Sequence, residues 1–357
     1  MKIAFVCPRY YPFIGGVETH VQSICEGLND CGIKPTVLTT TPNDLLPRSE
    51  EINNVSILRF KGYSPNNSYH FSFDLLKYLS THSNTFDIIH THSYASITSL
   101  FASHTKNQNK LVFTPHYHGK GHTKFRNLLH KPYKYFGKAI FHKSEKIISV
   151  SKHERSLLIN DFSISPDKVV VIPNGIQLTD FTNFENRRKK TSENNILYVG
   201  RLEKYKNVDK IIATLPLLSD DVNLRIVGVG SEKANLYELA RELKILGRVT
   251  FLNNVSRLEL LEEYFFSDLF ILLSSFEAYG ITVAEALASQ TPSIVLDSGA
   301  LSEWIDGKNC FGLTPPIDTI HLSQLIGAVI GKRIDHVGSF TWTESINKHL
   351  EIYNEIF

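Results

Sequence analysis

Short apolar runs alternate with amphipathic stretches along most of the chain, and this alternation predicts a series of β-α units. The runs are rich in β-branched residues, as expected for strands of parallel sheets that are joined by helices. In the first half of the chain the runs cover 2–7, 35–39, 86–90, 110–114, 146–150 and 169–173, and in the second half 196–200, 224–228, 249–252, 269–273 and 293–296. We therefore predict an α/β fold with one such set of strands in each half.

Apolar positions at helical spacing predict the first and last helices. The segment 342–357 places apolar residues among polar ones and predicts a closing amphipathic helix. Cys31 and Gly32 are expected to end the first helix, because glycine commonly follows the last helical residue. One buried face of that first helix is expected from Val17, Val21, Ile24, Cys25 and Leu28.

The length of 357 residues indicates two domains, because a single core rarely grows beyond ~250–300 residues. A polar, charged stretch between the two sets of runs predicts a linker. Parallel sheets bind ligands at the carboxyl ends of their strands, so site residues are sought directly after the runs. The predicted parts are an N-terminal domain over 1–178, a linker over 179–195, a C-terminal domain over 196–335 and a closing helix over 336–357.

The composition limits which partners and which cellular compartment are expected, but it says little about the activity. The formal net charge of +2 is small, and nothing resembles a nucleic-acid recognition module, so no nucleic-acid partner is expected. The four cysteines show neither a C-x-x-C pair nor zinc-ligand spacing. The first apolar run stops at Pro8, too early for a signal peptide, and no stretch approaches the ~20 apolar residues that cross a bilayer. We expect a cytoplasmic protein, either free or peripheral on the cytoplasmic membrane face.

The first candidate site motif is a glycine pair directly after the first apolar run. Gly15 and Gly16 open the first predicted helix, where the backbone can approach a ligand closely and unpaired N–H groups can bind an anion. A tight turn that needs glycine only for its backbone conformation would give the same pattern. Both interpretations stay open at this point.

A histidine follows the run 110–114. His116 stands at the carboxyl end of a predicted strand, where a neutral imidazole can form a hydrogen bond with a sugar hydroxyl. A single histidine is often structural, but this position ranks His116 above His20, His142 and His349.

Two basic residues follow the first strand of the second half. Arg201 and Lys206 can converge on a pyrophosphate, arginine as a bidentate fork and lysine as a point charge. The alternative is that both side chains are simply solvated at the surface. That alternative fits Arg201 poorly, because Arg201 directly follows a strand end and a glycine.

The most specific motif is a pair of glutamates around a predicted helix start. Glu277 lies in the loop after an apolar strand and Glu285 on the following helix, so one can hold a sugar hydroxyl and the other a ribose. The amides around Gly280, Ile281 and Thr282 can bind phosphate at that helix start. Two solvated helix glutamates would be the alternative, but small and apolar residues surround this pair.

A basic, aromatic-rich segment covers 120–146, where Glu145 is the single acid. An amphipathic segment of this kind can lie on an anionic bilayer, at roughly 1 kcal/mol per basic residue. Alternatively it is an ordinary helix whose lysine stems cover the core. Its basic residues are Lys120, Lys124, Arg126, Lys131, Lys134, Lys138, Lys143 and Lys146.

Taken in order, these blocks resemble family 4 of the retaining glycosyltransferases, and the likeness runs over nearly the whole chain. The resemblance implies the GT-B fold, with two Rossmann-like β/α/β domains facing a central cleft. The blocks are Gly15 to Glu18, Thr114 to His116, Pro173 to Ile176, Gly200 and Arg201 with Lys206, Gly228 to Gly230, and Glu277-x7-Glu285.

The resemblance also implies roles for individual residues. His116, Glu277, Arg201 and Lys206 would act in catalysis, with His116 near the sugar 6-hydroxyl, Glu277 on the sugar hydroxyls and the two cations on the diphosphate. Gly16 would lie against the phosphates and Glu285 on the ribose. The other donor contacts would come from Gly15, Gly228, Gly230, Gly280, Ile281 and Thr282.

No metal or other cofactor is expected, since basic side chains and helix ends take the place of a metal in this family and the chain lacks an Asp-x-Asp motif. Ala278 departs from the family pattern, in which glycine or proline is common, but this change removes no ligand. The stretch 229–233 lacks the third glycine of a G-x-G-x-x-G motif, which disfavours a nicotinamide-dependent oxidoreductase.

The function implied is retaining transfer of a hexose from a UDP- or GDP-sugar to a glycan or lipid-linked acceptor, in cell-surface glycan or glycolipid synthesis. A front-face reaction is expected, in which Glu277 is not a covalent nucleophile. The alternatives are a sugar-nucleotide-binding protein without transferase activity and an epimerase of GT-B-like fold.

Overall fold

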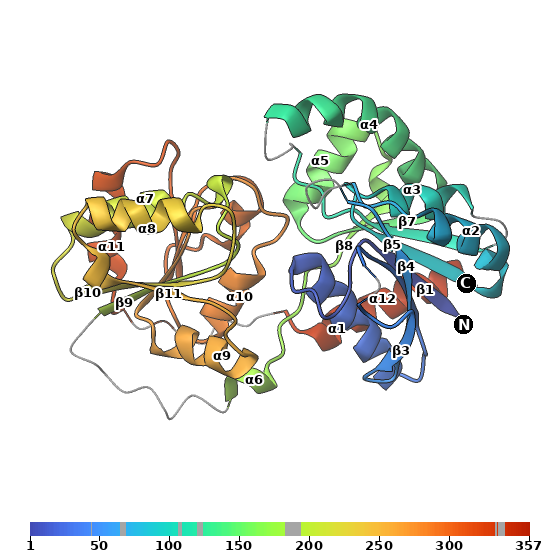
Figure 1. Ribbon diagram of the computed structural model, residues 1–357, viewed down its shortest axis with the longest axis horizontal. Helices are drawn as coiled ribbons and strands as arrows, with labels where there is room; N and C mark the ends of the chain where they lie inside the picture. The colour runs from blue at the N-terminus through green and yellow to red at the C-terminus, as the bar shows by residue number, and fades with distance from the viewer. Residues whose placement is uncertain are drawn as a thin grey trace. The chain divides into compact units, whose positions relative to one another are not determined.

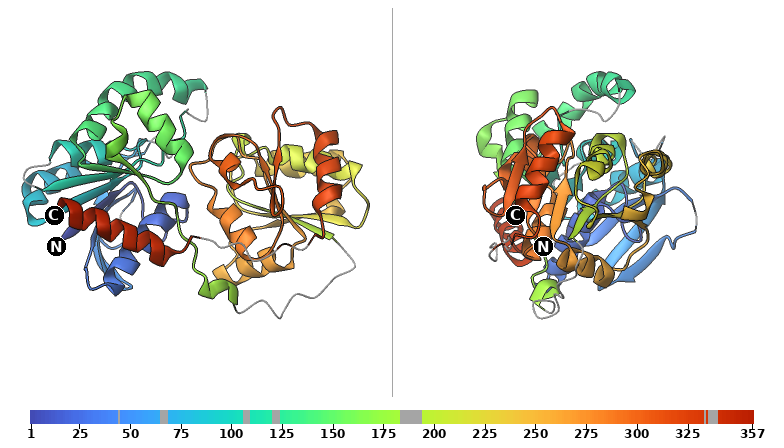
Figure 2. Two further views of the ribbon diagram at one scale, coloured as in Figure 1. Left: turned by 180° about the vertical axis from the view of Figure 1, so that it is seen from behind. Right: turned by 90° about the vertical axis from the view of Figure 1, so that its left-hand side faces the viewer.

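The computed structural model describes residues 1–43, 45–64, 69–105, 109–119, 124–182, 194–332, 334 and 340–357. They form two compact units, which Figures 1 and 2 show from three sides. The first unit combines Met1–Gly175 with Phe340–Phe357, and the second comprises Ile176–Ser339. Each unit is built on one sheet, which confirms the fold class predicted from the apolar runs.

The sheet of the first unit has the strand order β3-β4-β2-β1-β5-β6-β7-β8. Its neighbouring strands are parallel except for β3, which is antiparallel to β4. Strand β1 is buried along its whole length because helices cover both faces, whereas β4 alternates between buried and more exposed positions. The strands are β1 (Ile3–Cys7), β2 (Thr36–Thr41), β3 (Ser49–Ile52), β4 (Val55–Lys61), β5 (Ile88–His92), β6 (Lys110–Thr114), β7 (Lys146–Ser149) and β8 (Val169–Val171).

Two groups of helices cover this sheet, with α1 and α12 packed together on one face and α2 to α5 on the other (Figure 1). The predicted apolar face of α1 is confirmed, since only Val17 of its five residues stays partly exposed. Helix α12 packs so closely that a Cβ atom on Gly27 would lie 1.9 Å from Cδ1 of Ile346. The helices are α1 (Gly16–Asp30), α2 (Phe73–His82), α3 (Ile97–His104), α4 (Lys124–Lys143), α5 (Lys152–Phe162) and α12 (Trp342–Ile356).

The second unit has a parallel sheet in the order β11-β10-β9-β12-β13-β14. Helices α7, α8 and α11 lie on one face, and α9 and α10 on the other (Figure 1). Its strands are β9 (Asn194–Val199), β10 (Val222–Val227), β11 (Val249–Leu252), β12 (Leu269–Leu272), β13 (Ser293–Leu296) and β14 (Cys310–Leu313). Its helices are α6 (Thr179–Thr182), α7 (Val208–Thr214), α8 (Lys233–Glu242), α9 (Arg257–Phe266), α10 (Ile281–Ala288) and α11 (Thr319–Val329).

Every apolar run predicted as a strand is a strand, but β3, β4 and β14 were missed by the sequence pattern. Strand β3 is a short polar edge strand, and β14 carries a glycine that weakens a strand pattern. The predicted linker begins with the short helix α6 and ends inside β9, because Asn194 and Asn195 pair with β10. Its residues 183–193 lie outside the described residues.

The strand order places one central strand with earlier and later neighbours in each sheet. Strand β1 stands between β2 and β5, and β9 stands between β10 and β12. Open parallel sheets bind ligands beyond the carboxyl ends of their strands at such a switch point. The loops after β1, β5 and β6 in the first unit, and after β9, β10 and β12 in the second, are therefore where each candidate site is expected.

Candidate active site

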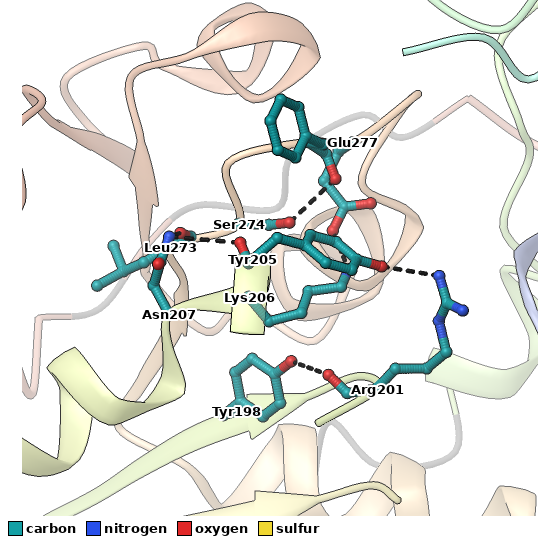
Figure 3. A network of polar contacts seen from close by, with 9 residues as sticks. Tyr198, Arg201, Tyr205, Lys206, Asn207, Leu273, Ser274 and Glu277 are labelled. Carbon is teal, nitrogen blue, oxygen red and sulfur yellow. Dashed lines mark hydrogen bonds and ion pairs between the residues drawn. The ribbon is translucent and has the colours of Figure 1, made fainter. Parts of the chain in front are cut away.

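In the second unit, the loops after β9 and β12 meet through a buried ion pair. The Lys206 Nζ atom donates to Oε1 of Glu277, and the two side chains are only 10% and 18% exposed (Figure 3). A pair this well buried is screened less by solvent than a surface pair. The structure thus joins two predicted site residues that lie far apart in the sequence.

Arg201 lies in the same loop as Lys206 but on its exposed side. Its Nη2 atom donates to the Tyr205 hydroxyl at 2.7 Å (Figure 3). The buried Tyr198 hydroxyl donates to the Arg201 carbonyl oxygen at 2.8 Å. The backbone at Arg201 is therefore fixed from the core side, while its guanidinium reaches towards solvent.

Asn207 was not identified from the sequence, yet it ties the two loops together. Its φ of +54° is in the left-handed region, which asparagine tolerates better than most residues. Its amide donates to the Leu273 carbonyl at 2.7 Å and to the Ser275 hydroxyl at 2.9 Å. The Ser275 N–H donates in turn to the Tyr205 carbonyl at 2.9 Å, so the loop that carries Lys206 cannot shift independently of the loop that carries Glu277.

The predicted donor-binding glycines after β10 have a packing role in the structure. A Cβ atom on Gly228 would lie 1.9 Å from the carbonyl oxygen of Gly200, and one on Gly230 would lie 2.2 Å from that of Leu202. These glycines let the loop after β10 pack backbone against backbone on the loop after β9. Contact with a donor stays a prediction for both.

Gly280, Ile281 and Thr282 lie at the N-terminus of α10, where the sequence predicts a helix start. Gly280 has a φ of +92°, a left-handed conformation that favours glycine, and a Cβ atom there would lie 2.9 Å from Cδ2 of Leu301. Gly280 offers no side-chain cap to the first N–H groups of α10. A helix start without a side-chain cap suits an anionic ligand.

Glu285 has partners different from those of Glu277. Its Oε1 accepts from Nη1 of Arg257 at 2.6 Å and its Oε2 from the Tyr264 hydroxyl at 2.9 Å. Arg257 also donates to Asp180 through Nε at 3.0 Å. The two carboxylates of the signature therefore belong to separate polar clusters, a division that their spacing in the sequence does not reveal. Burial raises the pKa of Tyr264 well above its usual range, so this hydroxyl keeps its proton.

The glycine pair of the first unit lies at the start of α1. A Cβ atom on Gly15 would lie 2.4 Å from a carboxylate oxygen of Glu18. A Cβ atom on Gly16 would have no atom of the described residues within 4 Å, apart from its chain neighbours and the backbone of its own helix. The Glu18 carboxylate pairs with Nε of Arg9 at 2.9 Å. Gly15 is thus explained by local packing, and Gly16 leaves open space beside the helix start.

His116 follows β6 in a left-handed conformation with a φ of +50°. Burial holds the pKa of its imidazole well below the usual range, so the ring is neutral at pH 7. His20 was ranked below it from the sequence, yet the two rings meet edge to face with centroids 4.9 Å apart. The structure therefore places His116 within a group of buried histidines rather than alone.

Glu154 fixes the loop that carries His116. This fully buried residue of α5 accepts the N–H of Tyr117 at 2.5 Å and that of Val150 at 2.7 Å. Burial raises the pKa of Glu154 to about 8, and the two N–H donors oppose that shift because they favour the charged form. Glu154 lies about one helical turn after the predicted strand 146–150. The sequence pattern did not predict its hydrogen bond with the N–H of Tyr117, which follows another strand.

The basic segment forms α4 over Lys124–Lys143. Lys134 pairs with Asp161 at 3.4 Å and lies 5.2 Å from the Phe162 ring, and Lys146 pairs with Glu355 at 2.7 Å. Lys138, Lys143 and Tyr135 are exposed. Lys120 and the side chains of 124–132 lie outside the described residues. None of the helices in the described part of the chain is long and apolar enough to span a bilayer.

Comparison with known proteins gives two family matches that follow one another along the chain. The family described as Glycosyltransferase Family 4 matches residues 14–180, and the family described as Glycosyl transferases group 1 matches residues 180–330. Together they cover residues 14–330, which include all the candidate site residues described above.

Similar individual proteins are known from several organisms. An uncharacterized glycosyltransferase of Methanocaldococcus jannaschii is 28% identical over 356 residues, which cover 90% of this chain and 89% of that protein. The alpha-monoglucosyldiacylglycerol synthase of Streptococcus pneumoniae is 26% identical over 328 residues, covering 86% of this chain and 74% of that protein. The crystal structure of Anabaena HepE in complex with UDP and glucose has a TM-score of 0.80 at 17% identity and covers 99% of this chain and 100% of that one.

Proposed function

Because the chain belongs to glycosyltransferase family 4, whose members use nucleotide sugars, we propose that it is a retaining enzyme that transfers a hexose from a UDP- or GDP-sugar. It has the GT-B fold and is a glycosyltransferase. The observation that carries the finer proposal is the buried pair of Lys206 with Glu277, beside Arg201 and the start of α10. Cations and a carboxylate stand together there, as a diphosphate sugar requires.

In the proposed reaction, the pair of Lys206 and Glu277 exchanges partners when the donor binds. Lys206 and Arg201 bind the diphosphate, and Glu277 accepts hydrogen bonds from hydroxyls of the sugar. The bond between the anomeric carbon and the phosphate oxygen then breaks, and the two cations stabilise the charge that develops on the leaving group. The acceptor oxygen bonds to the same face of the anomeric carbon, and its proton passes to the leaving phosphate.

Glu285 is proposed to bind the ribose. Arg257 and the Tyr264 hydroxyl each occupy one of its oxygens. An ionised carboxylate has about four acceptor sites, so both oxygens can still accept from a diol. The same two partners keep the carboxylate oriented before the nucleotide arrives.

The first donor to test is UDP-glucose, because the HepE structures contain UDP with glucose or UDP-glucose. Incubation with UDP-glucose, UDP-galactose and GDP-mannose, following release of the nucleoside diphosphate, tests the proposal directly. Anomeric configuration of the product by NMR tests retention. Binding without release in the presence of acceptors would favour a sugar-nucleotide-binding protein, and interconversion of the nucleotide sugar would favour an epimerase.

We propose a glycan or lipid-linked acceptor, presented at a cytoplasmic membrane face. Support comes from the name of the Streptococcus pneumoniae relative, which makes a glucosylated diacylglycerol, and from the exposed Lys138 and Lys143 on α4. Each change of these lysines to glutamate alters the local charge by two units. Flotation with phosphatidylglycerol vesicles should therefore show weaker binding for the double variant K138E/K143E. A parent protein that ignores such vesicles at low salt would leave α4 as a helix whose lysines cover the core, and would favour a soluble acceptor.

A further inference from the structure

The interior of the first unit contains a cluster of three histidines, of which only His116 has a place in the expected reaction. His20 comes from α1, His92 from the end of β5 and His116 from the loop after β6. Their ring centroids lie 4.9 to 5.9 Å apart, and one nitrogen from each ring lies within 4.8 Å of the others. His20 and His92 are fully buried, and His116 is half-buried.

Each of the three rings has at least one nitrogen without a hydrogen-bonding partner among the described residues. These nitrogens are Nε2 of His20, Nε2 of His116 and both ring nitrogens of His92. A buried polar atom without a partner costs about 1–3 kcal/mol, so most such atoms in folded proteins have one. Unpaired nitrogens on three rings that converge on one point therefore indicate a ligand.

The tautomer of His20 is set by its neighbour. Its Nδ1–H donates to Oδ1 of Asn174 at 2.7 Å, which leaves Nε2 with a lone pair and no hydrogen-bonding partner among the described residues. Histidines that bind a metal commonly donate their other ring N–H to a carbonyl or carboxylate in this way. Asn174 therefore holds His20 in the form that a metal requires.

Another histidine in the same core provides an internal comparison. His90 bonds the Tyr353 hydroxyl at 2.6 Å through Nδ1 and the Thr114 hydroxyl at 2.8 Å through Nε2. Both of its nitrogens are satisfied, as expected for a structural histidine. His92, two residues further along β5, has neither nitrogen satisfied, whereas His349 of α12 in the same core lacks a partner only at Nε2.

We propose that His20, His92 and His116 bind a divalent first-row transition metal such as Zn²⁺, with a fourth coordination position available to water. Three imidazoles suit Zn²⁺, and zinc–nitrogen bonds of about 2.0–2.1 Å place tetrahedral ligand atoms roughly 3.3 Å apart. Small inward rotations of the rings bring nitrogens within 4.8 Å of one another to that separation.

The metal would act on the position of His116 and not on the transfer itself. It would join the loop after β6 to α1 and β5, and so hold His116 in its left-handed conformation. The inference does not rest on the proposed function, because metal binding is measured on the protein alone. It differs from the expectation from sequence that no metal is bound, which rested on the family resemblance, the cysteine spacing and the lack of an Asp-x-Asp motif.

Titration with Co²⁺ tests the site. Protein without a polyhistidine tag is stripped with a chelator and titrated with Co²⁺, followed by visible ligand-field absorption and by metal content after dialysis. The parent should bind one Co²⁺ per chain with the bands of a tetrahedral site, and Zn²⁺ should displace it. His92→Gln should abolish these bands, whereas His321→Gln should not, because His321 is an exposed histidine of the second unit.

Two further variants keep the test informative if His92→Gln does not fold by circular dichroism. His116→Asn removes a half-buried ligand, and asparagine tolerates the left-handed backbone there, so it should also abolish the bands. Asn174→Ala should weaken metal binding by about 10–100-fold, as expected when the partner of a ligating histidine is lost. A parent protein that retains no Co²⁺ or Zn²⁺, or a folded ligand variant that binds metal as the parent does, would overturn the proposal.

Discussion

Each unit places buried carboxylates beside its predicted site, and the two units hold them in different ways. In the second unit, Glu277 is paired with Lys206 and Glu285 with Arg257. In the first, backbone N–H groups hold Glu154, and burial raises its pKa against the opposing effect of these hydrogen bonds. A carboxylate paired with a mobile side chain can exchange that partner for a ligand. A carboxylate held by backbone N–H groups, such as Glu154, instead fixes a loop. The two kinds of partner therefore distinguish carboxylates that can bind a ligand from one that holds the surrounding loops in place.

The largest effect is expected where the exchangeable pair is broken. Lys206→Ala removes a cation from the leaving group and leaves Glu277 without its partner, so turnover should fall by about 10²–10³-fold. Arg201→Ala should lower turnover in the same direction. Initial rates of nucleotide release measure both. Lys204→Ala is the matched control, since Lys204 is an exposed neighbour in the same loop and should leave the rate unchanged.

The second effect separates the two glutamates of the signature. Glu277→Gln should lower turnover by about 10–100-fold while free nucleoside diphosphate still binds, because Glu277 acts on the sugar. Glu285→Gln should weaken the free nucleotide as well, because it acts on the ribose. Calorimetric titration with UDP and GDP distinguishes them. Equal nucleotide affinities in the two variants would contradict the division of roles, although their separate partners in the structure favour it.

The third effect concerns Glu154 and pH. Its pKa is raised from 4.5 to about 8 on folding, so the folded state holds more protons than the unfolded state between these values. The contribution of Glu154 to stability is therefore present below pH 4.5 and is lost as pH rises through about 8. Urea unfolding of the parent should show this loss, on the order of a few kcal/mol. Glu154→Gln should unfold with a flatter pH dependence over the same window, and a slope equal to that of the parent would exclude this role.

The smallest effect separates two glycines that the sequence assigned to donor binding. Gly228→Ala should destabilise the second unit by about 1–3 kcal/mol, because its Cβ atom would overlap the Gly200 carbonyl. Gly16→Ala should leave stability nearly unchanged and weaken donor binding, since the position faces open space. Gly247→Ala provides the stability control, because a Cβ atom at Gly247 would have no atom of the described residues within 4 Å apart from its chain neighbours. Thermal unfolding and donor titration of the three variants measure both effects.

The sequence predicted those parts of the molecule that depend on local pattern. Apolar runs located the strands, and strand ends pointed to His116, Arg201 and Glu277, because parallel topology gathers strand ends at one edge. The sequence did not reveal how side chains from distant segments pair. The hydrogen bond from His20 to Asn174 and the pairing of Glu285 with Arg257 each join residues with no shared spacing.

The packing of α12 against α1 has a consequence for how the chain is made. The first unit needs both Met1–Gly175 and Phe340–Phe357, and the whole of the second unit is encoded between them. During translation, the second unit is synthesised before Ile346, the α12 residue that packs against Gly27 of α1. Domains generally fold as units while synthesis proceeds. The first unit can therefore complete its packing only after the second unit has been synthesised.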